Sequence, residues 1–117
     1  MLKNDLPIAQ MAEKMMDLAS FRQSLIANNM ANVDTPEFKT KDIDFRAELR
    51  RAAMSDAPSA KPAVKEPAGL LQRPDGNNVS LEREGLNMAE TQLQFAMGAQ
   101  LVKREYRKLL SAINEGR

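Results

Sequence analysis

Apolar residues recur at heptad spacing through the last third of the chain. The positions that lie seven residues apart are Leu81, Met88, Phe95, Val102 and Leu109. Such a repeat is typical of a long helix that packs one side against another helix. The pattern predicts a helix over residues 80–117.

A second apolar stripe lies beside the first and widens the apolar face of this helix. Its members are Leu86, Ala89, Leu93, Ala96, Met97 and Leu101, which we call the outer stripe. A face this wide indicates contact with more than one neighbour. Gly85 and Gly98 each cost roughly 1 kcal/mol relative to Ala within a helix. Either packing outweighs that cost, or the glycines mark the close approach of a partner.

The ends of this helix carry the expected signals. Asn78 or Ser80 can cap the first turn, Glu82 and Glu84 place negative charge at the positive end of the helix dipole, and Gly116 can close the helix. A helix of about 35 residues is roughly 50 Å long, too long for this chain to surround with a compact core. It is therefore either the long arm of a helical hairpin or an assembly element whose packing other chains complete.

Residues 1–36 carry a second helical pattern that stops at a proline. Asp5 can cap the helix, and Pro7 falls in the first turn, where its missing N–H leaves no hydrogen bond unmade. The main apolar positions at helical spacing are Ile8, Met11, Met15, Leu18 and Leu25. Pro36 ends the helix because it disfavours helical angles at the residue before it. Antiparallel packing of the two terminal helices would bury both apolar faces.

Three amides gather near the end of the first helix, at Asn28, Asn29 and Asn32. Asparagine is a weak helix former because its side chain bonds readily to nearby backbone groups. Two interpretations stay open at this stage. The cluster terminates the helix, or it forms hydrogen bonds to a neighbouring chain.

Residues 37–79 lack a continuous pattern. Ile43 and Phe45 alternate with a polar residue as in a strand, whereas Phe45, Leu49 and Ala52 are spaced for a helix, so either structure fits.

Prolines interrupt residues 55–69, and the composition of that stretch predicts a mobile segment. Residues 73–78, with the sequence Arg-Pro-Asp-Gly-Asn-Asn, are a strong turn signal that leads into the last helix.

These patterns together predict one mainly α domain. Residues 1–36 and 80–117 form long amphipathic helices packed as a coiled-coil-like hairpin. Residues 37–79 form a largely irregular, partly disordered middle segment.

Composition argues against catalysis. The chain has no Cys and no His, which excludes disulfides, thiolate or imidazole metal sites and Ser–His or Cys–His nucleophiles. The carboxylate pairs Asp42 with Asp44 and Glu82 with Glu84 are best explained as solvated charge and as compensation of the helix dipole. Residues 75–77 lack the spacing of a calcium loop. We expect no enzyme activity, no catalytic residue, no metal and no cofactor.

Charge and hydropathy limit the partners. The net charge is +1, without a basic patch of the kind that binds nucleic acid. The sequence contains no run of about 20 apolar residues, so we expect no segment that inserts in a membrane. The first residues lack the basic and apolar regions of a cleaved signal peptide.

A segment near the end of the first helix resembles the N-terminal signature of bacterial flagellar rod and hook proteins. That signature runs approximately Ala-x-Asn-hydrophobic-Ala-Asn-x-x-Thr-Pro-Gly-aromatic-Lys. The matching residues are Asn29, Ala31, Asn32, Thr35, Pro36, Phe38 and Lys39. The chain departs from it at Glu37, where Gly is usual, which puts a left-handed turn there in question.

Residues 73–84 resemble the entry to the C-terminal helix in proximal-rod members of the same family, and Asn77, Asn78 and Glu82 belong to this second motif. An Asp is more usual at Ser80, and a larger residue at Gly85. The resemblance covers both ends of the chain and only loosely its middle. Both motifs in order, in a short chain, make it specific.

The resemblance implies a structural subunit of the proximal rod of the flagellar basal body, which crosses the periplasm. Such subunits are exported unfolded by the flagellar type III apparatus, without a cleaved signal, and assemble through their terminal helices. The implied partners are other rod proteins, the rod–ring adaptor protein, the membrane ring or export gate, and further copies in the rod.

Assembly would use a seam between the terminal helices. The assembly seam consists of Leu81, Met88, Phe95, Val102 and Leu109 on one helix and Ile8, Met11, Met15, Leu18 and Leu25 on the other. The outer stripe would meet neighbouring subunits.

Two other functions remain open. A helical subunit of another export system, such as a needle protein, would be a hairpin with a tight turn, which the long middle segment argues against. A soluble helical adaptor would bind one partner helix at fixed stoichiometry instead of forming a polymer.

Overall fold

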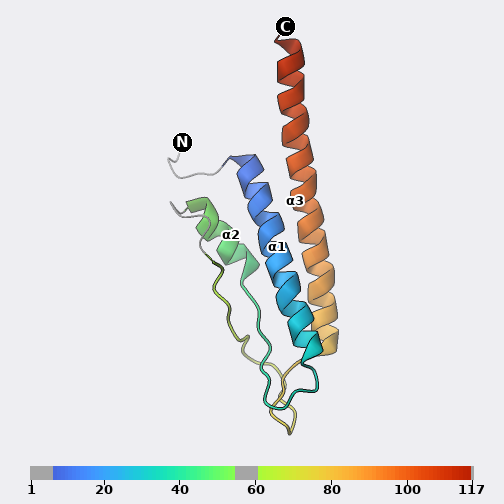
Figure 1. Ribbon diagram of the computed structural model, residues 1–117. Coiled ribbons are helices and arrows are strands. Elements are labelled where there is room, and N and C mark those ends of the chain that lie inside the picture. The colour runs from blue at the N-terminus through green and yellow to red at the C-terminus, as the bar shows by residue number, and fades with distance from the viewer. Residues whose placement is uncertain (1–6, 55–60, 117) are drawn as a thin grey trace.

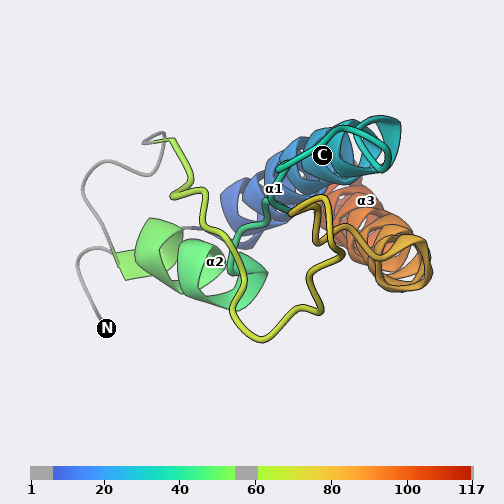
Figure 2. The ribbon, with the colours of Figure 1, turned by 90° about the horizontal axis from the view of Figure 1, so that it is seen from below.

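The computed structural model describes residues 7–54 and 61–116. Three helices form in these residues: α1 (Ile8–Ala31), α2 (Phe45–Met54) and α3 (Leu81–Glu115). α1 and α3 run antiparallel and pack together, and α2 lies against α1 on one side of the pair (Figures 1 and 2). The described residues contain no β-strand, only a single bridge between Asp42 and Lys65. The prediction of a mainly α protein with packed terminal helices is confirmed.

The ends of α3 form as the sequence indicates. Ser80 is its N-cap, and the Ser80 Oγ accepts a hydrogen bond of 3.2 Å from the Arg83 N–H. Gly116 follows the last residue and donates its N–H to the Ala112 carbonyl. At the start of α1, Pro7 is the residue before the helix instead of a member of its first turn, and it still sacrifices no hydrogen bond. Asp5 lies outside the described residues.

The middle segment contains a helix where the sequence left strand and helix open. Asp44 caps α2, because its carboxylate accepts a hydrogen bond of 3.0 Å from the Ala47 N–H, and that bond lowers the pKa of Asp44. Burial opposes the charge of Glu48, but hydrogen bonds from Arg51 and the Ala63 N–H outweigh burial and lower the Glu48 pKa. The expected mobile stretch falls partly on residues 55–60, outside the described residues.

The buried side of α3 carries small and polar residues. Its buried members are Glu84, Thr91 and Gly98, which lie seven residues apart. On α1 the buried members are Ala12, Leu18, Ala19, Arg22, Ile26 and Asn29. The buried residues of α3 therefore also recur at heptad spacing, but in a different register from the large apolar residues.

Several predicted seam residues are not buried between the helices. Leu81, Phe95 and Leu109 are 52%, 42% and 56% exposed, so they are not part of the buried core between the two helices, and their role in the assembly seam stays a prediction. Two helices approach most closely where side chains are small, so a bulky residue such as Phe95 lies beside the line of contact. Leu109 lies on the part of α3 that extends beyond Ile8, the first residue of α1 (Figure 1).

The remaining seam residues differ in their burial. Met88 and Val102 are half-buried. On α1 only Leu18 is fully buried, Met11, Met15 and Leu25 are half-buried, and Ile8 is 54% exposed. A role of these residues in assembly stays a prediction.

Gly98 marks the point of close approach between the two long helices. A Cβ atom at this position would lie 2.7 Å from the Met16 Cγ and 2.9 Å from the Ala12 carbonyl oxygen. A Cβ at Gly85 would meet nothing within 4 Å. Of the two explanations for the helix glycines, close approach therefore holds at Gly98, where the neighbour is α1 of the same chain.

We expect Gly98→Ala to destabilise the protein. A gain of about 1 kcal/mol in helix propensity is outweighed by overpacking against a backbone oxygen, which typically costs about 1–3 kcal/mol. The matched control, Gly85→Ala, should raise the free energy of unfolding by up to about 1 kcal/mol, because it gains propensity without a clash. Urea denaturation followed by circular dichroism measures both. Equal stabilisation by the two substitutions would contradict the close approach.

Candidate functional site

The two family-like motifs meet in space, although about 40 residues separate them in the chain. They lie where α1 ends and α3 begins, at the lower end of the molecule in Figure 1. We call this region the base and define it as residues 28–41 and 70–84. The Glu37 N–H donates to the Asp75 carbonyl at 2.9 Å, and the Asn78 N–H donates to the Phe38 carbonyl at 3.3 Å.

Asn77 occupies the centre of the base and is completely buried. Its side-chain amide donates two hydrogen bonds of 2.8 Å, to the carbonyls of Asn32 and Thr35. Its carbonyl oxygen accepts a 2.8 Å hydrogen bond from the Val79 N–H. One side chain thus satisfies backbone groups just beyond α1 and just before α3, where helix ends leave them without helical partners.

Further polar side chains of the motifs hold the two segments together. The Thr40 N–H donates to the Asn78 side-chain oxygen at 2.6 Å. Lys39 Nζ donates to the Gln72 side chain at 2.8 Å and also to the Gly76 carbonyl.

Other motif residues have lesser roles in the base. Lys41 lies over the ring of Phe38, with 4.8 Å from Nζ to the ring centre. Ala31 is the last residue of α1, and Pro36 and Glu82 are exposed.

Arg73, which sequence reasoning did not single out, also bridges the segments. Its guanidinium donates to the Val33 carbonyl after α1 and, at 2.9 Å, to the Val79 carbonyl before α3. The sequence gives only a weak signal for this role, because the neighbouring Pro74 and Gly76 indicate a turn and nothing indicates a partner for Arg73.

Asn29 resolves the question raised by the amide cluster. Its side-chain nitrogen donates 2.8 Å hydrogen bonds to the Lys41 carbonyl and to a Glu84 carboxylate oxygen, and its oxygen accepts from the Lys41 N–H at 3.0 Å. Asn32 bonds locally to Asn28, as a helix terminator does. Asn29 instead joins α1 to distant parts of its own chain, which neither interpretation anticipated.

A buried charged cluster fixes the segment after the first motif between the two long helices. Arg22 donates two hydrogen bonds to the Asp42 carboxylate, at 2.9 and 3.2 Å, and one to Glu90 at 2.5 Å. Arg83 lies 3.5 Å from Asp42 and 3.2 Å from Glu84. Burial of the Arg22 guanidinium opposes its charge, but the bonds to Asp42 and Glu90 outweigh burial and raise its pKa.

Sequence reasoning missed this cluster. Asp42 was interpreted as solvated charge and is only 8% exposed, and Glu84 was assigned to the helix dipole and is 1% exposed. One signal could have revealed it: Arg22 precedes Asn29 by seven residues, so both lie on the same side of α1. A charge at that position needs a buried partner of opposite sign.

Glu37 adopts a left-handed backbone conformation, which the presence of glutamate at this position had put in question. Its φ is +63°, and among the described residues it alone combines a positive φ with a side chain. The left-handed turn is therefore present here with glutamate, and the strain of a Cβ in this conformation remains in the fold.

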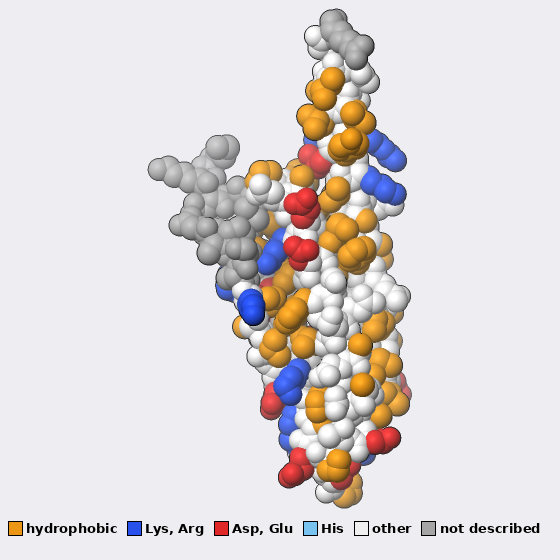
Figure 3. All heavy atoms as spheres, in the orientation of Figure 1, with side chains coloured by type: hydrophobic (Ala, Val, Ile, Leu, Met, Phe, Trp, Pro, Cys, Tyr) orange, Lys and Arg blue, Asp and Glu red, His pale blue; other side chains and the backbone are white. Residues whose placement is uncertain are grey.

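The outer surface of α3 is apolar over most of its length (Figure 3). In the outer stripe Leu86 is 70%, Leu93 63% and Met97 51% exposed. Beyond the start of α1, the exposed apolar residues are Tyr106, Leu109, Leu110 and Ile113.

The described residues contain no group of three His, Cys, Asp or Glu side chains that could hold a metal ion. In the described part of the chain, no helix has both the length and the apolar character that crossing a membrane requires.

Comparison with known proteins identifies flagellar rod proteins that are similar to this chain over most of its length. The chain is 31% identical over 109 residues to the flagellar basal body rod protein FlgB of Borrelia hermsii, an alignment that covers 74% of this chain and 81% of that protein. It is 33% identical to FlgB of Cereibacter sphaeroides, covering 82% and 85%. Identity to FlgB of Escherichia coli (strain K12) is 28%, covering 89% and 91%. No protein-family model matches the chain.

We expect Glu37→Gly to raise the free energy of unfolding by about 1 kcal/mol, because glycine adopts a positive φ without the steric penalty of a Cβ. The control is Glu37→Ala, which removes the same carboxylate but retains the Cβ and should not show this gain. Thermal denaturation compares the two. An equal gain from both variants would attribute the effect to charge and contradict backbone strain.

Asn77→Asp should destabilise the fold by about 2–4 kcal/mol, since a buried carboxylate oxygen would face the two backbone carbonyl oxygens that the amide N–H groups of Asn77 now contact. Asn28→Asp makes the same change at an exposed position near the end of α1 and should cost less than about 1 kcal/mol. Similar losses in urea denaturation would show that Asn77 does not organise the base.

Proposed function

The chain belongs to the FlgB family of flagellar basal body rod proteins, and on that basis we propose that it is exported through the flagellar type III apparatus and assembles through its terminal helices. Its coarse role follows from the family: it is a structural subunit of the flagellar basal-body rod. The finer proposal concerns how the chain reaches the rod and which surfaces it uses there.

The exposed outer stripe is the observation that carries the proposal for assembly. Leu86, Leu93 and Met97 keep more than half of their surface in solvent while the opposite side of α3 packs on α1. Contact with a neighbouring subunit would remove this apolar surface from water, which stabilises association by about 25 cal/mol for each Å² buried. A contiguous apolar strip of this kind is typical of an interaction site.

Hydrogen bonds between buried polar groups of the base support the proposal that each subunit keeps its helical hairpin within that assembly. Asn29, Asn77 and Glu84 are buried, and all three have hydrogen-bond partners inside the same chain. The base therefore needs no neighbour to satisfy it. We propose that neighbouring subunits contact α3 along its outer stripe and the seam residues that remain exposed, Leu81, Phe95 and Leu109.

The composition is compatible with export in an unfolded state. The chain has no Cys, so no disulfide has to be broken before export or formed after it. In the rod we propose contacts with other rod proteins, with the rod–ring adaptor protein and with the membrane ring or export gate. The work of the protein in this proposal is mechanical, without catalysis.

Leu93→Asp tests the outer stripe. We expect loss of swimming when this variant replaces the native chain in its bacterium, because a charge buried in an apolar contact is strongly unfavourable. The exported amount and the melting temperature of the purified chain should change little, because Leu93 is 63% exposed in the folded chain.

The matched control is Gln23→Asp, which adds the same charge at an exposed position of α1 and should preserve swimming. Normal swimming of the Leu93→Asp strain would contradict the assignment of the outer stripe to assembly. Loss of export in that strain would instead place the defect before assembly.

A further inference from the structure

An apolar stripe of α1 lies beside the line along which α1 meets α3. Met11, Leu18 and Leu25 recur every seven residues and therefore share one side of the helix, which we call the side stripe. Ala12, which meets α3 at Gly98, lies about 100° away around the helix. Leu18 is nevertheless only 1% exposed, and the other two members are half-buried. A part of the chain other than α3 must contribute to their burial.

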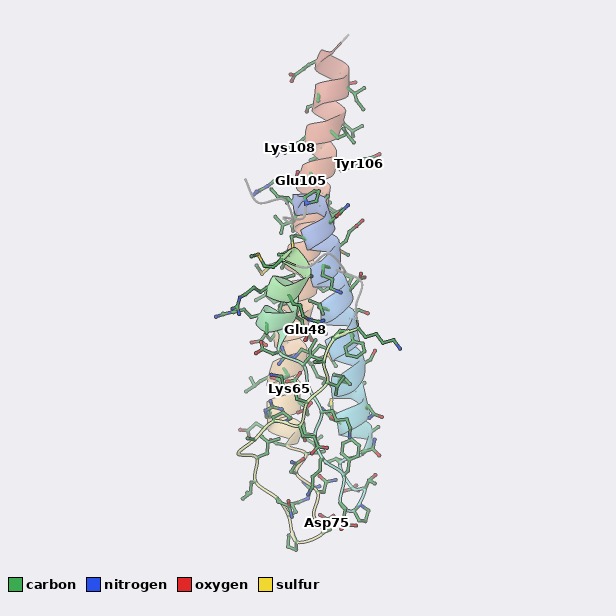
Figure 4. All side chains as sticks on the ribbon, turned by 90° about the vertical axis from the view of Figure 1, so that its left-hand side faces the viewer. Glu48, Lys65, Asp75, Glu105, Tyr106 and Lys108 are labelled. Carbon is green, nitrogen blue, oxygen red and sulfur yellow. The ribbon has the colours of Figure 1, made fainter. Side chains whose placement is uncertain are left out.

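The short helix α2 provides this cover. It contacts α1 and, within the described residues, does not contact α3. Phe45 and Leu49 of α2 line a groove of about 450 Å³ together with Met15 and Arg22 of α1. Leu18 lies between Met15 and Arg22 on the same side of α1. Figure 4 views the molecule from this side, with α2 (green) in front of the long helices.

The contact between α2 and α1 buries little apolar surface. Of the ten residues of α2, only Glu48 and Ala52 are buried. Ala52 contributes one methyl group, and Glu48 contributes a carboxylate that accepts hydrogen bonds from Arg51 and from the Ala63 N–H. A helix of this length is marginal in water without packing to support it. Little free energy therefore opposes the departure of α2 from α1.

The groove beside α2 is incompletely packed. It is also lined by Gln94 and Met97 of α3. Among the described residues, nothing donates a hydrogen bond to the buried side-chain oxygen of Gln94, and such an unmet acceptor costs about 1–3 kcal/mol. Met97 belongs to the outer stripe, so the groove separates that stripe from the side stripe. Without α2, the two stripes would form one continuous apolar surface.

The bonds that hold the hairpin together lie outside α2. Arg22 holds Asp42 at 2.9 and 3.2 Å, and Ile43 is buried, so the chain is fixed up to the residue before the cap of α2. Asn29 and Asn77 join the ends of the long helices and make no bond to α2. α2 can therefore swing away after Ile43 while the hairpin stays closed.

We propose that α2 is a removable cover: it occupies the side stripe in the free chain and leaves when the outer stripe of a second copy packs there. This inference rests on the proposed function and deepens it, because it adds an assembly surface on α1 and names what exposes it. The short internal helix is exchanged for a long helix of a neighbour. Free chains would thus keep this surface out of water until a second copy arrives.

The spacing and length of the two stripes favour this occupant. Leu86 and Leu93 recur at seven residues, as the members of the side stripe do, and stripes of equal period can interdigitate. The side stripe is about 20 Å long, whereas a ten-residue helix spans about 15 Å. α3, with 35 residues, covers the whole stripe. The exchange also removes Leu86 and Leu93 from water, where α2 leaves them.

A cysteine reporter tests the cover in the full-length chain, which has no cysteine of its own. A maleimide should reach Leu18→Cys only when the cover opens. Ala52→Asp places a charge in the contact between α2 and α1 and should speed this labelling at least about tenfold in dilute solution. Ile26→Cys, equally buried but on the side of α1 that Ala12 shares, should label slowly with or without Ala52→Asp.

The matched control for the added charge is Met54→Asp. Met54 is 57% exposed in the same helix, so this substitution should leave the labelling of Leu18→Cys unchanged. Circular dichroism of each variant verifies that the long helices are folded.

The second copy is tested by competition. An excess of the native chain should slow the labelling of Leu18→Cys in the Ala52→Asp variant at least about threefold, because bound chain covers the reporter by mass action. A chain with Leu93→Asp, which damages the outer stripe, should give no protection. A chain with Gln23→Asp, which carries the same charge at an exposed position of α1, should protect as the native chain does.

Three results would overturn the proposal. Equal acceleration at Leu18→Cys and Ile26→Cys would show that α2 does not open by itself. No acceleration by Ala52→Asp would show that α2 is not the cover, and full protection by the Leu93→Asp chain would exclude the outer stripe as the occupant.

None of these results touches the proposed function, which the swimming of the Leu93→Asp strain tests separately. Normal swimming of that strain, together with the expected labelling, would contradict the role of the outer stripe in the rod and leave the cover of α1 standing.

Discussion

The structure depends on hydrogen bonding of polar groups that are buried where α1 ends and α3 begins. Asn29 and Asn77 are almost completely removed from water, and a buried amide without partners is costly. Asn77 bonds to backbone on both sides of the base, and Asn29 bonds to Lys41 and Glu84. These directional bonds fix where the chain leaves one helix and enters the other. They therefore set the register in which the two long helices meet.

That register explains the composition of the helix interface. With Asn29 opposite Glu84, the small residues Ala12 and Gly98 meet farther along the pair, and the backbones come close. Bulky apolar side chains of α3 consequently lie outside the contact. The same constraint that closes the hairpin thus leaves Leu86 and Leu93 in solvent, available to other chains. Internal stability and external association use different sides of one helix.

The sequence predicted the parts of this fold that depend on periodicity and local signals. Both long helices, the Ser80 cap and the turn before α3 follow from spacing and capping rules, which act over a few residues. The register of the helix interface did not follow from the sequence. The large apolar residues indicated Phe95 as a contact residue, whereas the buried residue in that part of α3 is the small Gly98. The partners of Arg22 and Asn29 lie 12 to 68 residues away, and no single-sequence pattern encodes such pairs. The motif residues were recognisable, but their hydrogen bonds were not.

The most direct test of the central claim is the accessibility of the outer stripe before and after assembly. A single Leu93→Cys substitution can be labelled with a maleimide in the purified chain and in basal bodies isolated from swimming cells. We expect rapid labelling of the free chain and strong protection in the basal body, while a cysteine at exposed Gln23 serves as the reference for accessibility. Equal labelling of Leu93→Cys in both states would contradict the burial of this surface by neighbouring subunits.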